Sequence, residues 1–81
     1  MQISVDISLY PMNQSFEPPI IAFIEKLKTS GFTILENPLS TQIYGDYDQV
    51  MDFLKTAMKE TFVTEEMCVF TLKFVKGDRT S

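Results

Sequence analysis

The stretch QISVDISLY, residues 2–10, decides the fold, because apolar and polar residues alternate strictly along it. Alternation with a period of two residues is typical of a β-strand that buries one of its faces. We therefore expect a strand from Ile3 to Tyr10, ended by Pro11. Its apolar face carries Ile3, Val5, Ile7 and Leu9, and its polar face carries Ser4, Asp6, Ser8 and Tyr10.

The segment after this strand has the pattern of an amphipathic helix. Two prolines fit its first turn, where a missing N–H costs nothing, and apolar residues then recur at Ile20, Ile24 and Leu27. Gly31 is a good residue to follow the end of a helix, because it adopts positive φ without strain. The pattern predicts a helix over residues 18–30.

The remaining segments predict two strands, a second helix and a last strand. Residues 32–36 and 39–45 read as short strands separated by Asn37-Pro38. Asp46, with Gln49 three residues later, resembles a capping box that opens a helix with an apolar stripe as far as Phe62. Residues 67–75 alternate again. Phe70, Leu72 and Phe74 share one face, which we expect under the helices.

The predicted element order is β-α-β-β-α-β. Right-handed crossovers through both helices give a ferredoxin-like α+β sandwich, with a four-stranded antiparallel sheet and two helices on one face. The chain has 81 residues, enough for one domain. We assign residues 1–76 to this domain and residues 77–81 to a flexible C-terminal tail.

Charge and composition exclude several classes of function. The formal net charge is −4 and the only arginine is Arg79, so the chain lacks the basic patch that nucleic-acid binding needs. No apolar run reaches the ~20 residues of a membrane span, and no signal peptide is visible. The one cysteine, Cys68, cannot form an internal disulfide. A cytoplasmic location is the simplest interpretation.

The chemistry available to the chain argues against an enzyme. There is no histidine, which removes the commonest general base and metal ligand. Asp46, Asp48 and Asp52 could be read as hard oxygen ligands, but acids at the start of a helix more often cap it, and we favour capping. Cys68 has no base beside it and is best read as structural. We expect no catalytic residues, no metal and no cofactor.

The polar face of the predicted sheet is the best candidate for function. It combines hydroxyl groups, an acid, a base and an aromatic ring from three strands. Two interpretations remain open for this face: a small-molecule site, or packing against another sheet in an oligomer. Its members are Asp6, Ser8, Gln42, Tyr44, Thr71 and Lys73.

Two segments resemble a known family. VDISLYP at residues 5–11, and NPLSTQIYGD at residues 37–46 leading into DQVM at residues 48–51, are similar to the small single-domain members of the YkoF-like thiamine-binding family. The resemblance implies a ferredoxin-like domain that binds thiamine, or its hydroxymethylpyrimidine half, without reacting with it. It also implies a role in thiamine salvage, delivery or sensing, and a homodimer or homotetramer formed through the sheets.

The resemblance also directs attention to hydroxyl, amide, carboxylate and phenol groups that suit an aminopyrimidine and a thiazolium cation. An arginine cluster or a glycine-rich anion site for a diphosphate is missing, which favours the unphosphorylated vitamin as a ligand rather than a cofactor. The alternative is an oligomeric protein-interaction module without a small ligand. The candidate ligand-binding residues are Asp6, Ser8, Tyr10, Asn37, Ser40, Thr41 and Tyr44.

Overall fold

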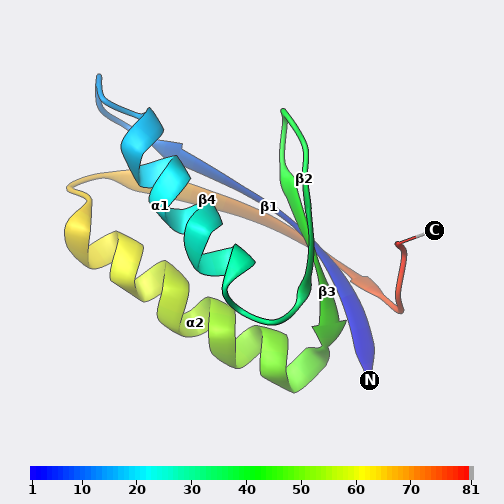
Figure 1. The fold of residues 1–81 in the computed structure, drawn as a ribbon. Helices are drawn as coiled ribbons and strands as arrows, with labels where there is room; N and C mark the ends of the chain where they lie inside the picture. Colours follow the sequence, from blue (N-terminus) through cyan, green and yellow to red (C-terminus); the bar gives the residue numbers. More distant parts are fainter. Residues whose placement is uncertain (81) are drawn as a thin grey trace.

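The computed structural model describes residues 1–80 and has one sheet covered on one face by two helices (Figure 1). The strands lie in the order β2-β3-β1-β4, and each neighbouring pair is antiparallel. The predicted ferredoxin-like fold is therefore confirmed. The elements are β1 (Gln2–Pro11), α1 (Glu17–Lys28), β2 (Thr33–Glu36), β3 (Thr41–Asp46), α2 (Tyr47–Thr64) and β4 (Cys68–Lys76).

Strand β1 is central, and its predicted apolar face is buried beneath the helices. Val5 is paired with Ile43 of β3 on one side and with Phe74 of β4 on the other. Side chains alternate between the two faces of a strand, so this register places three apolar rows on the helix side. The buried core consists of Ile3, Val5, Ile7, Phe23, Leu27, Ile43, Val50, Leu54 and Ala57.

Both helices begin as the sequence predicts. Pro18 and Pro19 lie in the first turn of α1, which buries Phe23 and Leu27. The Asp46 carboxylate caps α2 by accepting a hydrogen bond from the Gln49 backbone N–H at 3.3 Å. Capping is thus the observed role of Asp46.

Among residues 1–80, no group of acidic or cysteine side chains is placed to hold a metal ion. Neither of the two helices has the length and apolar character that a membrane-spanning helix needs.

The prediction for the start of β3 was wrong. The sequence pattern predicts that this strand begins at Leu39, but β3 begins at Thr41 and Leu39 is 90% exposed. Residues 37–40 instead form a four-residue turn, which the Asn37 N–H closes by donating to the Ser40 carbonyl at 3.0 Å. Because of this turn, β3 begins two residues later than the sequence alone indicates.

The last strand follows the predicted parity but is incompletely covered. Phe70 lies under the helices, with ring centroids 5.0 Å from Phe23 and 5.3 Å from Phe62. Phe74 is on the same face, yet it is 47% exposed because it lies beside α2 rather than beneath it. The expectation that all of this face is covered by the helices therefore fails at Phe74.

The residues after β4 return to β1. The Ser4 hydroxyl donates to the Gly77 carbonyl and accepts from the Arg79 backbone N–H, each at 2.8 Å. These bonds place residues 77–80 beside the start of β1. The predicted C-terminal tail includes Ser81, which lies outside the described residues, and its flexibility stays a prediction.

Gly45 allows β3 to pass close to the helix layer, and an added methyl group there should destabilise the fold. A Cβ atom at this position would lie 2.8 Å from Phe32 Cδ1 and 3.0 Å from Val50 Cγ2. We expect Gly45→Ala to lower the free energy of unfolding by about 1–3 kcal/mol through overpacking, measured by urea denaturation. Val50→Ala should lower the free energy of unfolding less in the Gly45→Ala background than in the wild type, because it removes the overpacked methyl group. If the two substitutions lower the free energy of unfolding additively, this explanation is wrong.

Candidate functional site

Strand β1 is longer than the pairing offered by β3. The β1–β3 ladder ends at the pair Ile7 and Thr41, whereas the β1–β4 ladder continues to the pair Pro11 and Cys68. Within residues 1–80, no strand therefore pairs with residues 8–11 on the β3 side. In an antiparallel sheet such an edge offers backbone N–H and C=O groups in fixed positions.

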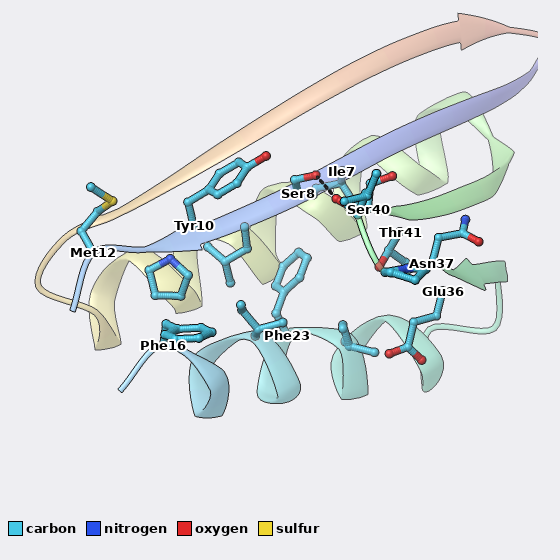
Figure 2. Close-up of a pocket in the computed structure, with 16 residues that line it drawn as sticks. Ile7, Ser8, Tyr10, Met12, Phe16, Phe23, Glu36, Asn37, Ser40 and Thr41 are labelled. Atoms are coloured by element: carbon cyan, nitrogen blue, oxygen red, sulfur yellow. Dashed lines mark hydrogen bonds between the residues drawn. The ribbon is translucent and has the colours of Figure 1, made fainter. Parts of the chain in front are cut away.

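A cavity of about 650 Å³ lies beside this open edge, between β1, α1 and the turn at residues 37–40. Its size is within the range of small-molecule sites. Figure 2 shows side chains reaching it from all three elements, with aromatic groups at the end formed by the start of α1 and polar groups at the end formed by the turn. The apolar part of the lining includes Leu9, Phe16, Ile20, Phe23 and Ile24, and the polar part Ser8, Glu36, Asn37, Ser40 and Thr41.

The structure brings most of the predicted binding residues to this one cavity. Those that line it are Ser8, Tyr10, Asn37, Ser40 and Thr41. Asp6 and Tyr44 do not line it. Tyr44 is only 9% exposed and lies opposite Ser4, toward the other end of the sheet.

Sequence reasoning missed the apolar half of the cavity. Phe16, Ile20 and Phe23 have the pattern of an ordinary core-facing helix, and nothing in their spacing indicates that part of this face borders a cavity. The cavity depends on the relative lengths of the strands, and the sequence pattern started β3 two residues too early. A long β1 beside a β3 that starts late leaves an edge that α1 passes but does not fill.

A hydrogen-bonded network fixes the turn to β1. Asp6 Oδ1 accepts from Ser40 Oγ at 2.7 Å and from Gln42 Nε2 at 2.5 Å. Gln42 Nε2 also donates to Ser40 Oγ at 2.9 Å. Gln42 Oε1 in turn accepts a hydrogen bond from the side-chain amide of Asn37. The Ser8 hydroxyl donates to the Leu39 carbonyl at 3.3 Å (Figure 2).

The hydrogen bonds from Ser40 and then Gln42, with a smaller contribution from the Lys73 charge, hold the pKa of Asp6 below its usual value, although burial opposes the shift. Asp6 is therefore a carboxylate at neutral pH and acts as an acceptor for its neighbours. At the thiol of Cys68 the shift is in the other direction, since burial and then the Glu65 charge raise its pKa. A thiol of this kind is a poor nucleophile.

Charge in the cavity is sparse and negative. Glu36 is the only charged residue in the lining, and its carboxylate lies 3.3 Å from Lys28 Nζ. The lining contains no lysine or arginine. Such a cavity can hold a flat, partly polar molecule by stacking and by hydrogen bonds, and it favours a neutral or positively charged molecule over an anion.

Several solved structures share this fold. A Thermotoga maritima protein assigned provisionally to thiamine biosynthesis or salvage is 20% identical, with a TM-score of 0.87 over 95% of this chain and 85% of its own. A Streptococcus pneumoniae protein is 24% identical, with a TM-score of 0.90 over 100% of this chain and 92% of its own. A Bacillus cereus domain of unknown function is 19% identical, with a TM-score of 0.80 over 100% of this chain and 81% of its own.

At these identities the structural matches establish the fold alone. None of the curated proteins matches the chain at a significant level. The sequence profile of one family, described as thiamine-binding protein, matches residues 5–76. This match spans β1 to the end of β4 and includes both segments of the resemblance and the whole cavity lining. The chain belongs to the thiamine-binding protein family.

Proposed function

We propose that this protein binds thiamine, or the hydroxymethylpyrimidine half of thiamine, in the cavity beside the open edge of β1 without catalysing a reaction. The binding would serve thiamine salvage, delivery or sensing in the cytoplasm, where a free cysteine such as Cys68 stays reduced. The proposal is supported by the family match together with one structural observation: an unpaired strand edge forms a wall of a cavity of about 650 Å³.

An aminopyrimidine suits this wall because it carries donors and acceptors along one flat edge. An open strand edge offers the complementary groups at fixed spacing, and Ser8 and Asn37 add a hydroxyl and an amide. The apolar floor formed by Leu9 and Phe23 would exclude water from the ring faces. Selective binding of a small polar ring needs this combination of a dry pocket with a few fixed polar groups.

The charge of the cavity further narrows the ligand class. The thiazolium ring of thiamine is a fixed cation, which Glu36 would attract and which the rings of Tyr10 or Phe16 could stack against. A diphosphate would find no lysine or arginine in the lining. We therefore favour the unphosphorylated vitamin.

Isothermal titration calorimetry with thiamine, hydroxymethylpyrimidine and thiamine diphosphate tests this proposal. We expect saturable binding of the first two and weaker binding of the third. Glu36→Gln should weaken thiamine binding about two- to fivefold, the range of a partly exposed charge pair, and should leave the neutral pyrimidine unaffected. The loss should shrink in high salt, because salt screens exposed charges.

Glu25→Gln is the matched control for this variant, since Glu25 is an exposed residue of α1 outside the cavity lining. Equal effects of the two substitutions would remove Glu36 from the site. An absence of heat with all three ligands, from folded protein, would overturn the proposed function itself.

A second candidate function rests on the open face of the sheet. Three apolar side chains on this face are well exposed: Leu35 at 44%, Val69 at 41% and Val75 at 37%. Tyr10 is on the same face and also lines the cavity. We infer that a second copy of the chain packs against this face to form a homodimer or homotetramer, which would also shelter the outer side of the cavity.

Sedimentation velocity tests this second candidate. We expect the wild-type protein to sediment as an oligomer, and Val69→Lys with Val75→Lys to sediment as a monomer, because two buried charges per copy would be left unpaired. Val63→Lys is the control, since Val63 is an exposed residue of α2 on the opposite layer. A monomeric wild-type protein would contradict this candidate.

A further inference from the structure

We propose that Gln42 is a positioning residue that clamps the turn at residues 37–40 to β1 and thereby sets the shape of the cavity. The inference rests on the proposed function for the identity of the ligand, but not for the clamp itself. Gln42 does not line the cavity. Its effect would pass through Asp6, Ser40 and Asn37.

The side-chain amide of Gln42 forms hydrogen bonds at both its donor and its acceptor end inside this network. Its NH2 group donates both to Asp6 Oδ1 and to Ser40 Oγ, and its carbonyl oxygen accepts from Asn37. A glutamate has no donors and would place a second carboxylate against Asp6. An alanine would remove all three contacts. The position therefore needs a side chain with a donor end and an acceptor end.

The register explains how this residue reaches both β1 and the turn. Gln42 is paired with Asp6 across the β1–β3 ladder, so their side chains are neighbours on the open face. Asn37 and Ser40 lie at the two ends of the turn, and the Asn37 N–H donates to the Ser40 carbonyl. Gln42 thus holds both ends of the turn to a carboxylate on the central strand.

The turn is a wall of the cavity, and no strand in the described part of the chain holds it on its other side. Asn37, Pro38, Leu39 and Ser40 all line the cavity, yet the β2–β3 ladder ends at the pair Glu36 and Thr41. Apart from the closing backbone bond, the turn is held by the clamp and by the bond from Ser8 to the Leu39 carbonyl. Loosening the clamp would let this wall move.

This arrangement also gives Asp6 a role different from ligand contact. Its Oδ1 already accepts two hydrogen bonds, and its side chain is on the open face rather than in the cavity. Lys73 of β4 is paired with it on the other side of β1. Asp6 is thus the anchor of the clamp, held in its charged form by the donors that it fixes.

Hydrogen exchange in the ligand-free protein and thiamine titration together test the clamp. In Gln42→Ala we expect the backbone N–H of Asn37 to exchange about five- to tenfold faster, because its hydrogen bond to the Ser40 carbonyl, which closes the turn, opens more often. We expect the affinity for thiamine to fall by a similar factor. Gln42→Glu should have the larger effect on both, owing to repulsion from Asp6.

Gln49→Ala is the matched control, because it makes the same change at an exposed position of α2 whose side chain is bonded to none of the described residues. Unchanged exchange at Asn37 in Gln42→Ala would overturn the clamp, and faster exchange with unchanged affinity would overturn its effect on the cavity. If either variant fails to fold, Ser40→Ala removes one arm of the clamp instead. If the wild-type protein binds no thiamine, the proposed function falls, while faster exchange at Asn37 still supports the clamp.

The pH dependence of stability provides a separate test of the Asp6 anchor. The pKa of Asp6 is lowered from 3.8 in the folded protein, so its stabilising contribution is complete above that value and is lost as the pH falls through the folded pKa. We expect Asp6→Asn to be less stable than the wild type near about pH 6 and the difference to shrink between about pH 5 and pH 2. Asp46 and Asp78 also have lowered pKa values, but both proteins retain them. If the difference in stability between the two proteins does not change with pH, the charge of Asp6 does not contribute to the anchor.

Discussion

The unequal pairing of β1 is the constraint on which the rest of this structure depends. Both neighbouring strands pair with its first half, but only β4 accompanies it beyond Ile7. The paired half organises the core, since its apolar residues lie between the rows of β3 and β4 and beneath the helices. The half that lacks β3 leaves backbone groups free at an edge, and the cavity forms there. The core and the cavity thus depend on two different halves of one strand.

The turn that joins β2 to β3 determines at which residue of β1 the pairing with β3 stops. Because residues 37–40 turn instead of continuing β3, the strand begins at Thr41 and cannot follow β1 to its end. A turn of this kind normally lies free on the surface. Here side-chain bonds to Asp6 and Ser8 hold it against the open face, so that it forms a stable wall. The same polar residues therefore appear as ligand candidates in the sequence and as structural supports in the fold.

This double role changes how the polar face of the sheet is understood. Asp6 and Gln42 satisfy one another and the turn and do not line the cavity, whereas Ser8 and Asn37 belong to the same network and line it. The remainder of that face is more apolar than its polar members suggest, because Leu35, Val69 and Val75 are interspersed among them. A face of this composition is suited to contact with another protein surface, and the cavity opens at its margin. Ligand binding and self-association are therefore compatible in this fold.

The sequence by itself determined the element order, the parity of β1, β3 and β4 and the cap of α2, because these depend on local periodicity and on hydrogen bonds between near neighbours. The residues of β1 could be assigned to a buried and an open face from their alternation alone. The resemblance and the chemical types of the side chains selected the candidate binding residues, but only the tertiary structure decided that Ser8, Tyr10, Asn37, Ser40 and Thr41 line one cavity. Only the tertiary structure decided that Leu39 is exposed, that Tyr44 lies away from the cavity, and that Phe16, Ile20 and Phe23 border it. Those outcomes depend on where one ladder ends and on how α1 passes the open edge, and no local pattern in the sequence encodes the relative lengths of paired strands.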